Sequence, residues 1–178
     1  LDPTMLLNKE DYIRLVEQEK TPTFREKLMT YVLDQSKEKQ AIVRKVSQTL
    51  GLSPNPVMPD MNFSQVGKKY INQCVFPPVT DWLRGFMDSE FVVTDSFHGT
   101  VFSILFNKPF IVMANSERGT ARLTSLLKKF ELEERWVHSL EDVTDKILHG
   151  SVDFEKANEI LGREREKANK FLIDSLNI

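Results

Sequence analysis

The chain has 178 residues, of which 24 are basic and 26 acidic, and its formal net charge is −2. This length fits one domain, and the balanced charge shows no electrostatic preference for nucleic acid. The single cysteine, Cys74, excludes an internal disulfide framework and a cysteine-rich metal site. The sequence shows no signal peptide, and no apolar run approaches the roughly 20 residues of a membrane span. These properties favour a cytoplasmic globular protein.

The first 25 residues are polar and weakly patterned, with only a short helix predicted over residues 10–19. The sequence opens on Leu1-Asp2-Pro3 and not on a methionine. We therefore expect a fragment of a longer protein. In that protein, residues 1–25 are expected to form a linker or a segment that crosses from a missing amino-terminal domain.

The next segment predicts a strand followed by a helix. Residues 28–33 are apolar and end at Asp34-Gln35-Ser36. Residues 37–50 place their apolar side chains on one helical face, and Gly51 is a natural terminator. The order of strand and then helix is typical of the opening unit of a doubly wound sheet.

A second, short strand is predicted over residues 54–61, which prolines interrupt. The following residues, 62–79, are irregular in pattern. Thr80 or Asp81 is expected to cap a helix that leads into the centre of the sheet. The apolar residues of that helix are Trp82, Leu83 and Phe86.

The most informative stretch runs from Phe91 to Thr120 and repeats one pattern twice. A buried strand at residues 91–93 ends in Thr94-Asp95-Ser96, and an almost wholly apolar helix follows from Gly99. A second buried strand at 110–113 ends in a polar cluster at 115–120 before another helical pattern begins. The stretch therefore predicts strand, polar loop and helix, in that order, two times.

The remainder of the chain predicts mostly helices. One apolar helical stripe covers residues 123–130, and a last short strand is expected at 136–137. A helix is predicted from Ser139 to Gly150, followed by a long terminal helix. The charged run at residues 163–167 is interpreted as a solvated face with ion pairs rather than a binding site.

The alternation of strands and helices predicts an α/β fold with a Rossmann-like, doubly wound parallel sheet. We expect residues 26–150 to form this domain. Residues 151–178 are expected to form a helix that packs on the domain or crosses back. Because the carboxyl ends of parallel strands meet at one edge, the polar loops at 94–99 and 115–120 should lie together at the ligand-binding edge.

The loop at residues 94–99 offers an anion site. Either Asp95 or Ser96 can cap the following helix, whose free N–H groups and positive dipole end attract an anion. His98 falls in the first turn, where it can donate to an anion or move a proton, and Gly99 leaves room for a ligand near the backbone. The alternative is that Asp95 and Ser96 only cap the helix and His98 is a satisfied, half-buried imidazole. We favour a capping role for Asp95 and a functional one for His98, since a buried apolar helix has no structural need for histidine there.

The loop at residues 115–120 offers cations. Arg118 has a planar guanidinium suited to phosphate or carboxylate, and Arg122 follows four residues later. Gly119 gives the backbone of the turn a wider range of conformations, and Thr120 can cap the next helix. Arg118 is open to two interpretations, a ligand contact or a surface ion pair, and its place beside the His98 loop favours the ligand. Glu117 is interpreted as an ion-pair partner rather than a base.

Several common site patterns are missing from the sequence. Neither glycine-containing loop has the spacing of a dinucleotide-binding fingerprint or a P-loop. The three histidines, His98, His138 and His149, do not have metal-ligand spacing. No Gly-x-Ser-x-Gly elbow is present, and the aromatic residues fall mostly in apolar runs, which disfavours a stacking surface for nucleic acid.

The segment VVTDSFHGTVFSILFNKPFIVMANSERGTARLTSLLKKFELEERWV resembles the signature of the bacterial polysaccharide pyruvyl transferase family. Leu1-Asp2-Pro3-Thr4, Tyr31-Val32-Leu33-Asp34 and the segment PVTDWL at 78–83 are similar to that family as well. Members have two Rossmann-like halves that face each other across a cleft, the GT-B arrangement. The resemblance implies that this chain is the carboxy-terminal, donor-binding half of such an enzyme.

The resemblance also implies an activity. A pyruvyl group passes from phosphoenolpyruvate to a sugar or lipid-linked oligosaccharide, forming a ketal across two hydroxyls and releasing phosphate. No metal or organic cofactor is needed, and phosphoenolpyruvate is the donor substrate. The expected location is the cytoplasm, including the inner face of the membrane.

Family members of known activity carry Arg-Leu-His at the turn that helps hold phosphoenolpyruvate. The matching residues here are Ser96, Phe97 and His98, so the histidine is kept and the arginine is not. Arg118 or Arg122 is the candidate replacement for the lost positive charge. By this comparison His98 is the acid and an anion contact. The residues expected to contact substrate are Ser96, Phe97, Gly99, Asn115, Arg118 and Arg122.

Two other functions fit the same pattern. A glycosyltransferase of GT-B architecture would hold the diphosphate of a nucleotide-sugar at the same helix end. A non-catalytic ligand-binding or assembly module would keep the fold without the chemistry.

Overall fold

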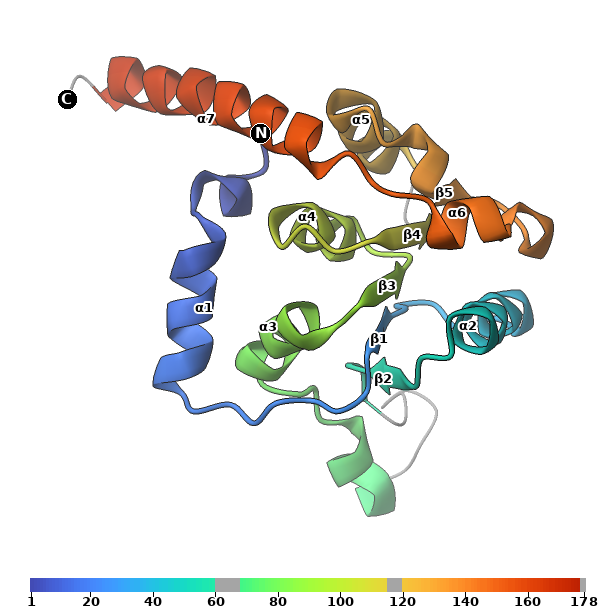
Figure 1. The fold of residues 1–178 in the computed structure, drawn as a ribbon. Coiled ribbons are helices and arrows are strands. Elements are labelled where there is room, and N and C mark those ends of the chain that lie inside the picture. The colour runs from blue at the N-terminus through green and yellow to red at the C-terminus, as the bar shows by residue number, and fades with distance from the viewer. Residues whose placement is uncertain (60–67, 115–119, 177–178) are drawn as a thin grey trace.

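The computed structural model describes residues 1–59, 68–114 and 120–176 (Figure 1). The strands are β1 (Leu28–Tyr31), β2 (Pro54–Pro56), β3 (Phe91–Thr94), β4 (Phe110–Met113) and β5 (Trp136–Val137). The α-helices are α1 (Lys9–Gln18), α2 (Lys37–Leu50), α3 (Val79–Asp88), α4 (Phe97–Leu105), α5 (Ala121–Phe130), α6 (Asp145–His149) and α7 (Phe154–Leu176). Short 3₁₀ segments are η1 (Pro3–Leu6), η3 (Lys68–Cys74), η5 (Glu133–Arg135) and η6 (Leu140–Asp142).

Over the described residues, five strands form one sheet in the order β2-β1-β3-β4-β5, and every pairing is parallel. This confirms the predicted α/β class and its Rossmann-like parallel sheet. Strand β2 lies on one side of β1, and the later strands β3, β4 and β5 lie on the other side. The order therefore reverses between β1 and β3, and open sheets bind ligands outside the carboxyl ends of the strands at such a reversal.

Helices cover both faces of the sheet, as Figure 1 shows. One core joins α3, α4 and α5 to the sheet and includes residues of α1 and α7, and a smaller core joins α2 and α6 to the other face. The central strands β3 and β4 are buried along their whole length, which explains their uninterrupted apolar sequences. The sheet is therefore a rigid base for the loops at its carboxyl edge.

Helix α2 follows the prediction closely. The Ser36 hydroxyl accepts a hydrogen bond from the backbone N–H of Lys39 at 3.1 Å and so begins the helix. Gly51 ends it in the left-handed region, with φ of 65°. The strand expected over residues 54–61 is shorter, because pairing with β1 covers only Pro54–Pro56.

One predicted helix start was wrong, and a second was confirmed only in part. Neither Thr80 nor Asp81 caps α3, because Pro78 occupies the N-cap position and makes no side-chain bond. The helix expected from Ser139 is divided into η6 and α6. Ser139 and Asp142 close a 3₁₀ turn by a reciprocal capping arrangement, and Thr144 starts α6 by accepting from the N–H of Ile147 at 3.4 Å.

The first segment of the chain is well packed. Helix α1 lies against α3, and η1 lies against α7, so Met5 and Val16 are fully buried. At the other end of the chain, α7 buries Ala157, Ile160 and Leu161. The division into residues 1–25, 26–150 and 151–178 stays a prediction.

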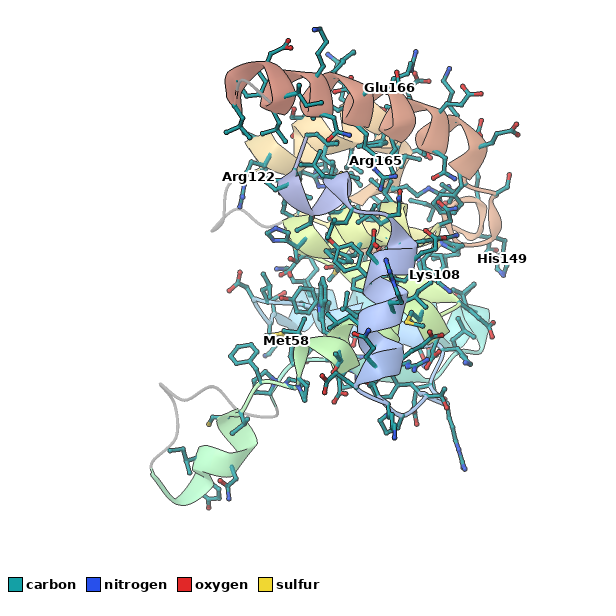
Figure 2. The ribbon with its side chains drawn as sticks, turned by 90° about the vertical axis from the view of Figure 1, so that its left-hand side faces the viewer. Met58, Lys108, Arg122, His149, Arg165 and Glu166 are labelled. Atoms are coloured by element: carbon teal, nitrogen blue, oxygen red, sulfur yellow. The ribbon has the colours of Figure 1, made fainter. Side chains whose placement is uncertain are left out.

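The charged run on α7 makes two kinds of contact. Glu164 pairs with Lys129 of α5 at 2.6 Å and with Lys167 at 2.7 Å, in line with the predicted ion pairs. Arg165 instead donates to the backbone near η1. In Figure 2, Arg165 lies between α7 and the start of the chain, whereas Glu166 lies on the outward side. The run is therefore only partly a solvated face.

Candidate active site at the carboxyl edge of the sheet

The turn between β3 and α4 is held by Thr94. Its hydroxyl donates to the carbonyl oxygen of Tyr31 at 2.7 Å and accepts from the N–H of Ser96 at 3.0 Å. A Cβ at Gly99 would stand 2.2 Å from the Thr94 hydroxyl oxygen. Glycine is therefore needed at this position for packing, and contact of Gly99 with a ligand stays a prediction.

Ser96, and not Asp95, caps α4. The Ser96 hydroxyl accepts from the N–H of Gly99 at 3.4 Å. Asp95 is 2% exposed, and its carboxylate accepts from the N–H groups of Leu33 at 2.7 Å and Asp34 at 3.2 Å. It also pairs with Lys39 at 2.6 Å. Asp95 thus ties the loop after β1 to the end of β3, across the point where the strand order reverses.

His98 lies in the first turn of α4 with its side chain 51% exposed. Its ring stands edge-on to Phe97, with centroids 5.5 Å apart. Among the described residues, no acceptor takes the backbone N–H groups of Phe97 and His98. A half-exposed imidazole thus stands beside two unpaired amides at the positive end of a helix, an arrangement that attracts an anion.

Arg122, in the first turn of α5, lies beside this turn. Its guanidinium carbon is 4.8 Å from the centroid of the Phe97 ring, a cation–π contact. In Figure 2, Arg122 is on the same side of the molecule as Met58, which follows β2. Arg122 therefore belongs to the carboxyl edge of the sheet.

A pocket of about 330 Å³ opens between the first two residues, α4 and α5. Its walls combine aromatic, aliphatic and charged side chains, a mixture typical of small-molecule sites. The lining residues are Leu1, Asp2, Phe97, Ala121, Arg122, Ser125, Leu126, Lys129 and Phe130.

The structure brings most of the predicted residues together. Ser96, Phe97, His98 and Gly99 form the turn, and Arg122 joins them through the Phe97 ring. Asn115 and Arg118, together with Glu117, lie outside the described residues, so their roles stay predictions. The next residue, Thr120, holds the N-cap position of α5 but makes no side-chain capping bond.

One residue near His98 was missed by the sequence reasoning. An Asp2 carboxylate oxygen lies 3.8 Å from His98 Nε2. In the sequence, Asp2 before Pro3 indicates only the start of a helical turn. Nothing in the pattern points to a residue 96 positions further along the chain.

One protein family matches this chain. A family model described as polysaccharide pyruvyl transferase matches residues 1–117, more than half of the chain. The chain therefore belongs to the polysaccharide pyruvyl transferase family, as the resemblance indicated. Neither the search of curated proteins nor the search of solved structures found a match. In the part of the chain that the structure describes, no helix has both the length and the apolar composition to cross a membrane.

Proposed function

We propose that this protein transfers a pyruvyl group from phosphoenolpyruvate to two hydroxyls of a sugar in a bacterial polysaccharide, forming a ketal and releasing phosphate. Membership of the family supports the reaction class. The main observation in support of the site is that the half-exposed His98 lies next to the backbone N–H groups of Phe97 and His98, which have no acceptor among the described residues. A trianionic donor matches a helix end that offers backbone N–H groups and an imidazole as hydrogen-bond donors.

The donor phosphate or carboxylate binds the N–H groups of Phe97 and His98, with Ser96 and Gly99 shaping the turn. Addition of the first hydroxyl breaks its O–H bond and forms a C–O bond at the substituted enol carbon. The double-bond electrons take a proton from His98 at the methylene carbon, and the proton of the first hydroxyl, passed directly or through solvent, replaces it on the imidazole. The second hydroxyl then displaces phosphate, which leaves with the electrons of its C–O bond, and the remaining hydroxyl proton passes to solvent or phosphate.

The cations supply the charge that the donor requires. Family members of known activity have an arginine where Ser96 stands here. The Arg122 guanidinium lies over the Phe97 ring, which supports Arg122 as the replacement for that lost charge. Arg118 and Asn115 are proposed as further donor contacts from the neighbouring loop. The chemistry requires no metal or organic cofactor.

The proposed architecture places this chain as the carboxy-terminal, donor-binding half of a GT-B enzyme. The acceptor, a sugar or a lipid-linked oligosaccharide, would then enter between this half and an amino-terminal domain. The proposed location is the cytoplasm or the inner face of the membrane.

Calorimetric titration of the complete protein with phosphoenolpyruvate tests the donor. We expect binding by the wild type and a loss of about tenfold in affinity in His98→Gln, because a charge-assisted contact is removed. His149→Gln is the matched control, since His149 is exposed and lies on α6, away from the site. Equal affinity in both variants would remove His98 from the donor site.

A glycosyltransferase with a nucleotide-sugar donor is the second candidate. The same unpaired amides of Phe97 and His98 favour a diphosphate as well. Titration with uridine- and guanosine-diphosphate sugars separates the two functions. Binding of one of these, without binding of phosphoenolpyruvate, would select the glycosyltransferase, and binding of neither would select a non-catalytic module.

A further inference from the structure

We propose that Asp2 is a positioning residue for His98, and that Arg165 of α7 holds Asp2 in place. This inference rests on the proposed function, because it concerns the same imidazole. It assigns a role to the first segment of the chain and to one member of the charged run on α7.

The two oxygens of the Asp2 carboxylate make different contacts. Oδ1 accepts from the Thr4 N–H at 3.0 Å and from the Thr4 hydroxyl at 2.6 Å, and thereby starts η1. Oδ2 lies 3.8 Å from His98 Nε2. The Asp2 side chain is only 15% exposed, so the capping bonds hold the carboxylate against the more exposed imidazole.

Segment η1 is itself fastened to the domain. Arg165 Nε donates to the carbonyl oxygen of Met5 at 2.6 Å, Nη1 donates to Asn8 Oδ1 at 2.7 Å, and Nη2 donates to the carbonyl oxygen of Leu7. All three nitrogens of one guanidinium therefore hold one short stretch of chain, through two backbone carbonyls and the Asn8 side chain, in the fixed planar geometry of arginine. Figure 2 shows Arg165 at this junction.

A second contact holds η1 against α1. The Tyr12 hydroxyl donates to the carbonyl oxygen of Thr4 at 2.8 Å. Burial, and then the charges of Asp2 and Asp11, raise the pKa of Tyr12, so the phenol stays a neutral donor. With Met5 fully buried, η1 is fixed to α1 and α7, and the position of Asp2 follows from these contacts.

The chemical consequence concerns His98 as an acid. An imidazolium that delivers a proton needs a fixed orientation, and a neighbouring carboxylate supplies it, as in other His–Asp pairs. Asp2, the N-cap residue of η1, lies beside the ring, and Arg122 of α5 lies beyond Phe97. Among the residues that the structure describes, Asp2 thus supplies a carboxylate that faces the imidazole.

A double-mutant cycle on the complete protein tests the inference, with phosphoenolpyruvate as the calorimetric probe. Asp2→Asn keeps an oxygen for the capping bonds but removes the charge. We expect it to weaken binding about threefold in the wild type, the scale of a half-exposed ion pair, and to have no effect in His98→Gln. Arg165→Gln is expected to weaken binding less, and likewise only when His98 is present.

Arg163→Gln and Asp174→Asn are the matched controls, because Arg163 is exposed on the same helix and Asp174 forms an exposed ion pair with Lys170 near the end of α7. Both should leave affinity unchanged. Equal weakening by Asp2→Asn in both backgrounds would indicate a merely structural role, and tighter binding in both would indicate simple repulsion of the donor; either result overturns the inference. If His98→Gln weakens binding and Asp2→Asn does not, only this inference fails. If the wild type does not bind phosphoenolpyruvate, the proposed function fails and the inference with it.

Discussion

At the scale of single residues, the carboxyl edge of β3 is held by buried side chains that form hydrogen bonds. Thr94 uses its hydroxyl to join β1 to the start of α4, and Gly99 leaves the space that this hydroxyl fills. Asp95 is buried and bound to the loop after β1. These residues carry no catalytic group, but they decide where His98 stands.

Gly99→Ala is expected to destabilise the protein by about 2 to 3 kcal/mol, because the new methyl group overlaps the Thr94 hydroxyl. Denaturant unfolding of both proteins measures the difference in the free energy of unfolding. Gly162→Ala on α7 is the control, since a Cβ there meets nothing within 4 Å. It should stabilise by about 0.5 to 1 kcal/mol, as expected for alanine in place of glycine inside a helix. Equal effects at both positions would contradict the packing argument.

Asp95→Asn is expected to destabilise the protein by about 3 kcal/mol, because it leaves the partly buried Lys39 ammonium without its carboxylate. One of the two carboxylate oxygens that accept from the backbone N–H groups of Leu33 and Asp34 is also replaced by an amide nitrogen. Urea unfolding at neutral pH provides the measurement. A change below about 0.5 kcal/mol, the usual range of surface substitutions, would show that Asp95 does not hold the loop after β1 to the end of β3.

At the scale of elements, α7 is attached to the domain by apolar contacts in its first half and by charged groups further along. Ala157, Ile160 and Leu161 are buried, Glu164 reaches Lys129 on α5, and Arg165 reaches η1. Phe171 and Leu176 are 70% and 63% exposed. The attachment of α7 therefore lies in its first three turns.

The pH dependence of this attachment follows from Glu164. Hydrogen bonds from Lys129 and Lys167 lower the pKa of Glu164 to about 2. Because the folded pKa lies below the ordinary value of 4.5, the stabilisation is fully present above pH 4.5 and is lost as the pH falls towards 2. Glu164→Gln should therefore cost about 0.5 to 1 kcal/mol at pH 7, and the difference from wild type should shrink below pH 4.5.

Urea unfolding at pH 7, 5 and 3 checks this prediction. Glu166→Gln, two residues away on the outward side of α7, is the control and should be neutral at all three pH values. A cost for Glu164→Gln that does not change with pH would assign the effect to packing and not to the ion pairs.

At the scale of the whole molecule, the candidate site combines segments from both ends of the chain. His98 and the α4 amides come from the centre of the sheet, Arg122 comes from the next helix, and Asp2 comes from the first turn. Arg165, near the other end, fastens that turn. The geometry of the donor site is therefore expected to depend on the docking of η1 and α7 as well as on the sheet.

The 178-residue chain by itself is expected to bind phosphoenolpyruvate without transferring its pyruvyl group. The physical reason is that the proposed cleft needs a second domain to hold the acceptor and exclude water. Phosphate release from phosphoenolpyruvate, measured with the chain alone and with the complete protein, makes the comparison. Turnover by the chain alone at the rate of the complete protein would contradict the two-domain proposal.

Local patterns in the sequence were sufficient for much of the fold. The buried strands β3 and β4, the amphipathic α2 with its end at Gly51, and the polar turn at His98 were all predictable, because each depends on residues close in the chain. The family was also predictable from the motif around His98. The start of α6 was not, since Ser139 caps η6 and Thr144 caps α6, and only the folded backbone decides that two separate elements form.

The roles of Asp2, Asp95 and Arg165 were decided by tertiary structure. Each acts on a residue more than 50 positions away, and the periodicity of a sequence carries no information about such contacts. A carboxylate before a proline predicts a cap, whereas its approach to an imidazole arises only when η1 docks beside α4. The sequence by itself determined which groups stand at the carboxyl edge of the sheet, and the packing of η1 and α7 decided which of them meet.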